Sequence, residues 1–371
     1  MARAWADVSL SAIAANVETL RSVSAPAEVC AVVKANGYGH GAVRVAQAAV
    51  EGGAAWLAVA QVAEATELRA AGVTAPILLL SEPPLGDLQA AAAAGVAITV
   101  YTEPAIRGLA SVARATNRPL PIHLKVDTGM HRVGASPAEI VGLAELVHVD
   151  PLLSLDALWT HCAVADEPDD PFTALQLERF DAAVAAIEGA GIPVPMRHAA
   201  NSAAVITHPS SHYDLVRCGI AVYGIAPAPD LVDRLALEPA VRLVTEVSFV
   251  KALAAGERVS YGLRHAVERD TTVATLPIGY ADGVFRRLGL EGQDVLVGGC
   301  RRPMIGVVTM DQVLVDLGPD SDVGVGDEAV LLGAQGPHRI SPDEWAARLG
   351  TISYEVVCAL GGRVERRYGR S

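Results

Sequence analysis

The chain has 371 residues, of which 51% are hydrophobic and 19% charged, and its formal net charge is −13. This length exceeds the usual size of one domain, so we expect two domains, and the apolar content excludes intrinsic disorder. The acidic excess argues against nucleic acid and anionic membranes as partners. No apolar run reaches the roughly 20 residues of a membrane helix, and Asp7 interrupts any secretory signal. We therefore expect a cytoplasmic protein.

Short apolar runs alternate with Ala-rich amphipathic segments from residue 29 to residue 222. A continuous apolar run between helical segments is typical of a parallel strand that is buried on both faces. We predict strands at residues 29–34, 55–60, 76–81, 96–100, 120–126, 153–159, 194–198 and 213–216. We predict helices between them at residues 41–52, 61–71, 86–94, 104–116, 136–148, 173–191 and 202–206. Eight such strands close a (β/α)8 barrel.

The pattern changes near residue 235, where helical segments give way to alternating runs separated by glycine turns. This pattern indicates a compact, mostly β domain, in which only residues 342–349 look helical. We therefore predict an α/β fold with an N-terminal (β/α)8 barrel over residues 1–235 and a β-rich C-terminal domain over residues 236–371. The first few residues are free in this scheme to pair with the C-terminal domain.

Polar residues follow the carboxyl ends of several predicted strands, where a (β/α)8 barrel forms its active face. Lys34 ends the first strand after Val32 and Val33, and burial there would lower its pKa and favour the neutral amine that attacks a carbonyl. The simpler interpretation is a lysine that reaches out of the barrel mouth into water. The later strands lead into Lys125, Arg132, His161, Asn201, Ser202 and Arg217.

The loops after the seventh and eighth strands are where barrels of this type commonly hold a phosphate. Ser202 begins a predicted helix, and Gly219 and Ile220 follow the eighth strand. Ser202 is equally well suited to be an ordinary helix N-cap. A lysine that faces a phosphate site indicates pyridoxal 5'-phosphate (PLP), which stabilises a carbanion beside the carboxylate of an amino acid. The five cysteines are scattered without metal-ligand spacing, so we expect buried thiols and no metal.

Residues 33–41, with the sequence VKANGYGHG, resemble the PLP-lysine motif of the alanine racemases, which are PLP-dependent enzymes of fold type III. The resemblance continues across essentially the whole chain. Its other parts are residues 125–132, 160–161, 201–203, 217–224, 259–262, 277–283, 310–312 and 353–355. The number, order and spacing of these segments make the resemblance specific.

The resemblance implies a homodimer that interconverts L-alanine and D-alanine and supplies D-alanine for peptidoglycan. Lys34 would hold PLP as a Schiff base and act as one catalytic base, and Tyr261 from the partner subunit would be the other. Two bases are needed because inversion removes a proton from one face and returns it to the opposite face. In the family the lysine takes the proton from D-alanine and the tyrosine takes it from L-alanine.

The resemblance also implies roles for the remaining residues. His161 would link the tyrosine to Arg217, whose guanidinium faces the pyridine nitrogen and keeps it unprotonated, so that racemisation outruns transamination. Arg132 and the Met310 N–H would bind the substrate carboxylate, with Asp311 beside them. The phosphate ligands would be Tyr38, Ser202, Gly219, Ile220 and Tyr354, with Asn201 nearby. Tyr280 and Tyr354 would narrow the access channel, and Lys125 matches a position that carries a carbamate in some members.

Three segments depart from the family pattern. Leu263, Arg264 and His265 replace the usual threonine and aromatic residue after the second base. Val307 stands where an arginine is common, and Cys218 where a proline is frequent. These changes bear on rate and on substrate breadth more than on the class of reaction.

Three functions other than alanine racemisation are alternatives for this sequence. A PLP-barrel amino-acid decarboxylase presents a carboxylate to the pyridine nitrogen and lacks the Ser-Tyr-Gly base, so Arg217 and Tyr261 argue against it. A non-catalytic PLP-binding protein is typically a barrel alone, so the β domain argues against it. A racemase with altered or broader amino-acid specificity is the third alternative.

Overall fold

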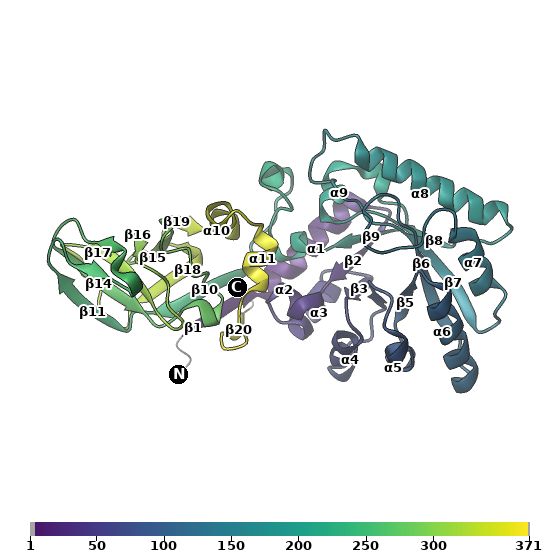
Figure 1. The fold of residues 1–371 in the computed structure, drawn as a ribbon, viewed down its shortest axis with the longest axis horizontal. Helices are drawn as coiled ribbons and strands as arrows, with labels where there is room; N and C mark the ends of the chain where they lie inside the picture. Colours follow the sequence, from purple (N-terminus) through teal and green to yellow (C-terminus); the bar gives the residue numbers. More distant parts are fainter. Residues whose placement is uncertain (1–3, 370–371) are drawn as a thin grey trace. The chain divides into compact units, whose positions relative to one another are not determined.

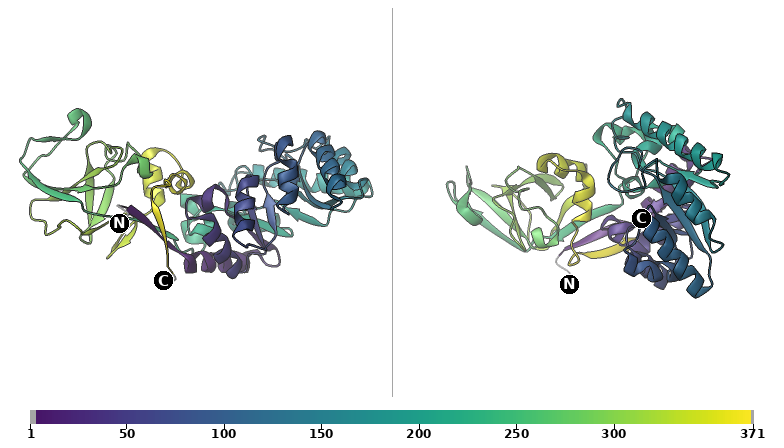
Figure 2. Two further views of the ribbon diagram at one scale, coloured as in Figure 1. Left: turned by 90° about the horizontal axis from the view of Figure 1, so that it is seen from below. Right: turned by 45° about the vertical axis from the view of Figure 1, so that its right-hand side comes forward.

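The computed structural model describes residues 4–369 and divides them into two compact units. The barrel unit contains residues 12–37 and 42–238, and the β unit contains residues 4–11, 38–41 and 239–369. Figures 1 and 2 show helices around the strands of the barrel unit and mostly strands in the β unit. Residues 1–3, which belong to the first few residues that we left free to pair with the C-terminal domain, lie outside the described residues.

The barrel unit contains the eight predicted parallel strands. They are β2 (Glu28–Val32), β3 (Trp56–Val59), β4 (Ile77–Leu79), β5 (Ala97–Val100), β6 (Leu120–Lys125), β7 (Leu153–Trp159), β8 (Met196–His198) and β9 (Leu215–Cys218). Their order is β8-β7-β6-β5-β4-β3-β2-β9. Backbone hydrogen bonds from Asp214 and Arg217 to the carbonyls of Arg197 and Ala200 join the two ends, at 3.1 and 3.0 Å. The barrel prediction is therefore confirmed.

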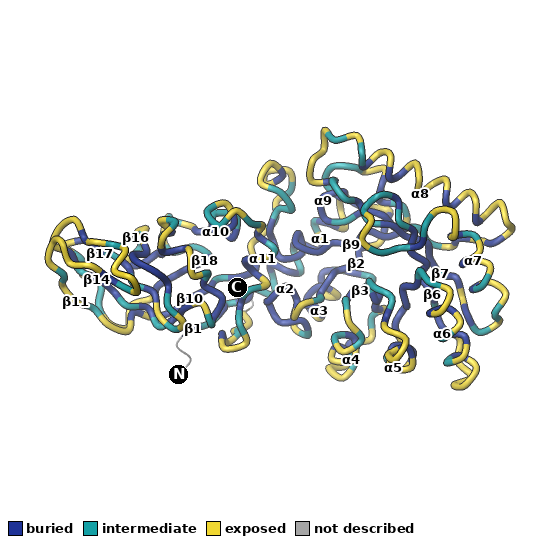
Figure 3. The backbone as a smooth tube through the Cα atoms, in the orientation of Figure 1, coloured by how far each residue is buried: buried dark blue, intermediate teal, exposed yellow. Residues whose placement is uncertain are grey.

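Seven predicted helices separate these strands, and two helical segments were not predicted, namely one long helix and the short left-handed turn α2 (Lys34–Tyr38). The predicted ones are α3 (Ala42–Glu51), α4 (Val62–Ala70), α5 (Leu88–Ala93), α6 (Glu103–Thr116), α7 (Ile140–His148), α8 (Phe172–Gly189) and α9 (Ser202–Thr207). The long additional helix, α1 (Leu10–Ser24), buries Ile13, Val17 and Leu20 on one face. The barrel strands are buried almost throughout, as the continuous apolar runs predicted (Figure 3).

The β unit is built on one long mixed sheet in the order β11-β14-β17-β16-β15-β18-β10-β1-β20. Its strands are β1 (Ala4–Ser9), β10 (Val241–Glu246), β11 (Phe249–Leu253), β14 (Thr271–Leu276), β15 (Asp294–Val297), β16 (Cys300–Ile305), β17 (Val313–Gly318), β18 (Glu328–Gln335) and β20 (Glu365–Gly369). Strands β19 (His338–Ile340), β12 (Arg258–Val259) and β13 (His265–Ala266) are short. The first strand of the chain, β1, runs antiparallel to β10 and parallel to β20 (Figure 2).

Two expectations about this unit are wrong. Besides α10 (Pro342–Leu349), it contains a second helix, α11 (Ser353–Cys358), whose six residues are too few to show a helical period in the sequence. The cysteines are not all buried, since Cys300 and Cys358 are exposed. None of the helices that the structure describes has the length and apolarity needed to cross a membrane.

Candidate active site

Lys34 follows β2 in an unusual left-handed turn. Helix α2 (Lys34–Tyr38) contains Ala35, Asn36 and Gly37 at φ values of 52°, 53° and 60°, and Tyr38 also has a positive φ. A non-glycine residue in this region costs roughly 1–2 kcal/mol, so the surroundings must hold the turn in place. The Ala35 N–H donates to the Glu64 carboxylate at 2.6 Å, and the Asn36 side chain accepts from the Ala42 N–H at 3.0 Å. These bonds fix the direction in which the half-buried Lys34 leaves the strand.

Arg217, on β9, is a buried cation held by neutral acceptors. Its side chain is 3% exposed. Nη1 donates to Nδ1 of His198 at 2.9 Å, and Nη2 donates to the carbonyls of Thr160 and Ala199 at 2.8 and 2.9 Å and to Nδ1 of His161 at 3.2 Å. Burial lowers the pKa of Arg217 to about 10, so the group still carries its charge at neutral pH. The charge is therefore localised in the barrel mouth without a carboxylate to cancel it.

His161 lies directly beside this cation, after β7. Burial lowers the pKa of His161 well below its usual value, and the charge of Arg217 lowers it further. The ring is therefore neutral at pH 7. Because a guanidinium can only donate, Nδ1 of His161 is the acceptor and the ring proton lies on Nε2.

Lys125 is a second buried cationic residue in the barrel mouth. It ends β6 and is 3% exposed. Its Nζ lies 4.2 Å from the centroid of the Trp159 ring, and Cζ of Arg217 lies 4.5 Å from the same centroid. Burial, followed by the charges of Arg217 and Arg132, lowers the pKa of Lys125 to about 7. A large share of this amine is therefore neutral at physiological pH.

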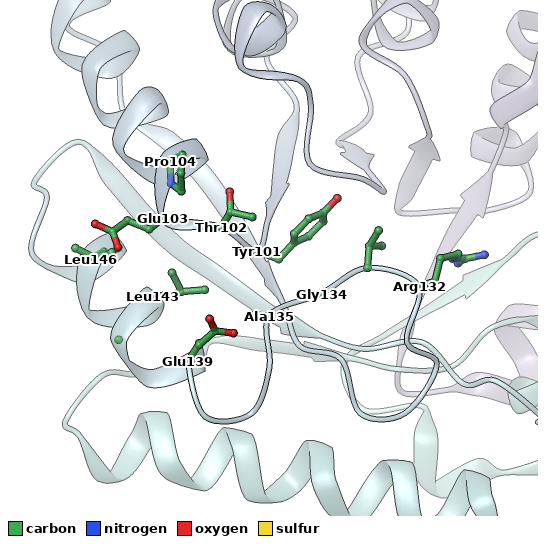
Figure 4. Close-up of a pocket in the computed structure, with 12 residues that line it drawn as sticks. Tyr101, Thr102, Glu103, Pro104, Arg132, Gly134, Ala135, Glu139, Leu143 and Leu146 are labelled. Carbon is green, nitrogen blue, oxygen red and sulfur yellow. The ribbon is translucent and has the colours of Figure 1, made fainter.

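Arg132 lies in the loop between β6 and α7. It lines a cavity of about 770 Å³ together with Tyr101 and Thr102, which follow β5, and Leu143 and Leu146 of α7. In Figure 4 Arg132 lies at one end of this row of side chains. The carboxyl ends of neighbouring strands thus bring Arg132 to the same rim as the other barrel residues.

Ser202 and Gly219 meet between the seventh and eighth barrel strands, β8 and β9. The Ser202 hydroxyl accepts from the N–H groups of Gly219 and Ala221 at 2.9 and 3.4 Å. The N-cap of α9 is Asn201, whose side chain accepts from the Ala204 N–H at 3.0 Å. The alternative interpretation of Ser202 as an N-cap is therefore wrong, because Asn201 is the last residue with extended backbone angles. Ile220 follows in a buried helical turn over Ile220–Tyr223.

Several of the expected site residues lie in the β unit, where two of them are paired. The rings of Tyr38 and Tyr354 have centroids 6.3 Å apart and are tilted by 49°. Burial, with the nearby Tyr354, raises the pKa of Tyr38, which stays a neutral hydrogen-bonding phenol at pH 7. The two aromatic side chains thus form one pair within the β unit.

The loop that contains Met310 and Asp311 is anchored to the turn at Tyr280. The N–H groups of Tyr280 and Ala281 donate to the carbonyls of Thr309 and Met310 at 3.0 and 3.1 Å. Arg363 pairs with Asp311 at 2.7 Å and with Asp282 at 3.1 Å. Gly279 permits this packing, since a Cβ there would lie 2.3 Å from the Thr309 carbonyl oxygen. The loop and the turn therefore form one rigid group.

Tyr261 stands out from the β unit with 73% of its surface exposed. It follows Ser260, whose φ of 61° redirects the chain and whose hydroxyl donates to the Val307 carbonyl at 2.7 Å. Thr309 and Gln312 line the same open pocket as Tyr261. A large aromatic side chain that is held outward by a strained turn is typical of an interaction or catalytic surface.

The structure thus gathers the expected residues into local groups. In the barrel unit Arg217 contacts His161, Lys125 shares the Trp159 ring with Arg217, and Ser202 contacts Gly219. In the β unit Tyr38 lies beside Tyr354, and Tyr280 is joined to Met310 and Asp311, while the exposed Tyr261 shares a pocket with Thr309 and Gln312 of the same loop.

Four residues of these groups were not predicted as site residues, namely His123, Trp159, His198 and Arg363. His123 had a signal, because it lies two positions before Lys125 in one strand and so shares its face. His198 ends β8, which is the position that we used to select the other barrel residues.

Comparison with known proteins places the whole chain in one family. Residues 8–227 match the family model described as alanine racemase, N-terminal domain, and residues 240–368 match alanine racemase, C-terminal domain. The chain is 47% identical to the alanine racemase of Symbiobacterium thermophilum, over 98% of this chain and 97% of that one. It is 44% identical to that of Thermobifida fusca, over 98% of both chains.

The similarity to solved structures supports the same family. The alanine racemase from D-cycloserine producing Streptomyces lavendulae matches with a TM-score of 0.94 and 41% identity, over 100% of this chain and 97% of that one. That of Bacillus anthracis with bound L-Ala-P matches with a TM-score of 0.94 and 36% identity, over 100% and 96% of the two chains. The chain therefore belongs to the alanine racemase family.

Proposed function

We propose that this protein is a PLP-dependent homodimeric racemase that interconverts L-alanine and D-alanine, with Lys34 and the partner subunit's Tyr261 as the two bases. The observation that carries the proposal is the buried Arg217, whose four hydrogen bonds all go to neutral acceptors. A decarboxylase of the same barrel class would place a carboxylate here. The Arg217 cation favours an unprotonated ring nitrogen and hence reprotonation over side reactions.

The barrel residues fit the proposed cofactor. The four hydrogen bonds of Arg217 use one N–H of Nη1 and the N–H groups of Nη2, so as far as the described residues show, Nε–H and the second N–H of Nη1 are the donors left for a ring nitrogen. Lys34 would hold PLP, and the N–H groups of Gly219 and Ile220 with the Ser202 hydroxyl would hold its phosphate, which would replace the hydrogen bond from the Gly219 N–H to Ser202. When bound, PLP withdraws electrons from the carbon that loses its proton. Asn201 beside Ser202, and the phenols of Tyr38 and Tyr354, are the further proposed phosphate contacts.

The proton transfers follow from the groups that the chain supplies. The Lys34 amine removes the α-proton of D-alanine, and the partner subunit's Tyr261 removes that of L-alanine. A phenol has an ordinary pKa of about 10 and needs a hydrogen-bond donor to act as a base near pH 7. His161 fits this need, because its Nδ1 accepts from Arg217 and its proton therefore lies on Nε2. His161 would thus donate to the phenolic oxygen and steady its anion.

Substrate binding is assigned to the rim residues. Arg132 would pair with the substrate carboxylate through its planar fork and also donate to the phenolic oxygen of the cofactor. The Met310 N–H would donate to the same carboxylate, with Asp311 held beside it by Arg363. Tyr280 and Tyr354 would narrow the channel and restrict the substrate side chain. The D-alanine produced would serve peptidoglycan synthesis.

Turnover resolved by chirality tests the proposed function. Starting from either pure enantiomer of alanine, we expect the purified protein to reach equal amounts of both, because enantiomers have equal free energies. A panel that adds serine and larger amino acids measures the breadth of the site. Release of CO2 from the amino acid would instead indicate a decarboxylase, and PLP binding without turnover would indicate a carrier.

Lys125 is the proposed site of a carbamate that orients Arg132. Its pKa of about 7 leaves the neutral amine dominant above that pH, and a neutral amine combines with CO2 to give a carbamate and a proton. With 13C-labelled bicarbonate, we expect a carbamate carbon signal that grows as the pH rises through 7 and is absent from Lys125→Met. The exposed Lys251 is the matched control, and a signal that survives in Lys125→Met but not in Lys251→Met would contradict the assignment.

A further inference from the structure

Two buried histidines extend the hydrogen-bond chain of Arg217 into the barrel interior. His198 and His123 are fully buried, with 0% of their surfaces exposed. Nδ1 of His198 accepts from Arg217 at 2.9 Å, and Nε2 of His198 lies 3.1 Å from Nδ1 of His123. These hydrogen bonds thus connect β9 to β8 and β8 to β6. The proposed function assigns no role to either histidine.

The direction of every proton in this chain follows from Arg217. A guanidinium only donates, so Nδ1 of His198 carries no proton. Burial and then the charge of Arg217 lower the pKa of His123 to about 3 and that of His198 well below its ordinary value, so both rings are neutral at pH 7. The His198 proton is therefore on Nε2 and is donated to Nδ1 of His123, whose own proton is on Nε2.

Aromatic packing fixes the planes of both rings. His198 stacks on Trp159 with ring centroids 5.4 Å apart and planes 11° from parallel. His123 lies 5.5 Å from the Trp56 ring and 5.2 Å from His198. Because Trp159 also lies against Arg217, the direction of the acceptor on His198 is set by the same ring that supports the cation. The guanidinium thus has one orientation in which all its bonds are made.

The series of hydrogen bonds ends at Nε2 of His123, a buried atom that has no hydrogen-bond partner among the described residues. A buried donor without a partner destabilises a protein, and a leucine at this position would avoid that cost. The same leucine would leave Nε2–H of His198 without its acceptor. The arrangement is therefore better suited to orienting His198 than to stabilising the barrel.

We propose that His198 and His123 are positioning residues that set the reaction outcome by holding Arg217 in one orientation as an uncancelled cation, with an N–H left to donate to the cofactor ring. A carboxylate in place of His198 would hold the arginine equally firmly but would cancel its charge, which would favour protonation of the ring nitrogen. A neutral imidazole holds the same geometry and leaves the charge in place. This inference rests on the proposed function, because it concerns how racemisation is kept from turning into transamination.

The first test needs no cofactor. In the apoprotein labelled with 15N-histidine, two-bond 1H–15N correlation spectra at neutral pH report which ring nitrogen carries the proton. We expect His198 and His123 both to be protonated on Nε2, and a proton on Nδ1 of His198 would overturn the proposal. This result does not depend on whether the protein racemises alanine, so it separates failure of this inference from failure of the proposed function.

The second test uses the loaded enzyme and four variants. His198→Leu removes the acceptor for Arg217, His198→Asn can restore an acceptor near Nδ1, and His123→Leu removes the last member of the chain. His212→Leu is the matched control, because His212 is buried in the same unit and only bonds the Val205 carbonyl. The measured quantities are the 15N shift of the pyridine nitrogen in labelled PLP and the number of racemisation turnovers for each transamination event.

We expect His198→Leu to move the pyridine shift toward the protonated form and to lower the turnover ratio by about tenfold, the effect of losing one hydrogen bond to a charged group. His123→Leu should change both quantities in the same direction by less, and His198→Asn should recover part of the loss. The ratio does not depend on how much protein folds. Unchanged shift and ratio in the folded variants, with only a fall in total activity, would show that the histidines are merely structural.

Discussion

Replacing Lys34 by alanine should abolish racemisation in both directions and remove the covalent attachment of PLP. The variant loses the amine that would hold the cofactor and the base that serves D-alanine, and loss of a general base alone typically slows a reaction by about 10²–10⁴-fold. Borohydride reduction of the holoenzyme, followed by peptide mass spectrometry, locates the attached lysine. The chain contains only Lys34, Lys125 and Lys251, so the assignment has three possible outcomes.

Lys125 is the main alternative to Lys34 as the lysine that holds PLP. It lies in the barrel mouth, and its pKa of about 7 makes it a good nucleophile at physiological pH. The structure favours Lys34 because the left-handed turn after β2 fixes its direction, whereas the Lys125 amine lies 4.2 Å from the centroid of the Trp159 ring. Lys251→Ala is the neutral control. If the reduced PLP adduct stays on the protein in Lys34→Ala and disappears in Lys125→Ala, Lys125 would be the residue that holds the cofactor.

The barrel could be predicted because each strand is a continuous apolar run between amphipathic helices. Parallel strands then place their carboxyl ends on one rim, and this topology alone selected Lys34, His161 and Arg217. The short helix α11 was not predicted because its six residues span fewer than two helical turns. Ser202 remained an alternative N-cap of α9 because Asn201 and Ser202 are adjacent and both suit the position, so that only backbone angles distinguish them.

The hydrogen bonds between the two buried histidines and the left-handed turn after β2 could not be predicted from the sequence. His123 and His198 are 75 residues apart, and nothing in a sequence tells which two of eight strands bring their side chains into contact. The turn at Ala35, Asn36 and Gly37 continues to Tyr38, and only asparagine and glycine favour its backbone angles. Alanine accepts them here because the Glu64 carboxylate and the Ala42 N–H bond to the turn at Ala35 and Asn36. The Tyr38 carbonyl accepts a hydrogen bond from Nδ1 of His40 at 2.8 Å, which holds the end of the turn.

Tyr261→Phe should slow the removal of the α-proton from L-alanine much more than from D-alanine. Phenylalanine keeps the ring and removes only the hydroxyl, and 73% of the Tyr261 surface is exposed, so the fold should not change. We expect a loss of about 10²–10⁴-fold for L-alanine, as for removal of a general base. Single-turnover exchange in deuterium oxide measures each direction separately. Tyr368→Phe, in the same unit, is the control, and equal losses for the two enantiomers would argue against a two-base assignment.

Mixing two inactive variants tests whether Tyr261 acts across a dimer. In a Lys34→Ala homodimer and in a Tyr261→Phe homodimer, both sites lack one base. A mixed dimer contains one site with both bases intact if the tyrosine is supplied by the partner subunit. Random exchange gives half of the dimers in mixed form, so we expect about one quarter of the wild-type activity to return, given two-fold symmetry. If each subunit instead used its own Tyr261, every site in the mixture would still lack one base, and no activity would return.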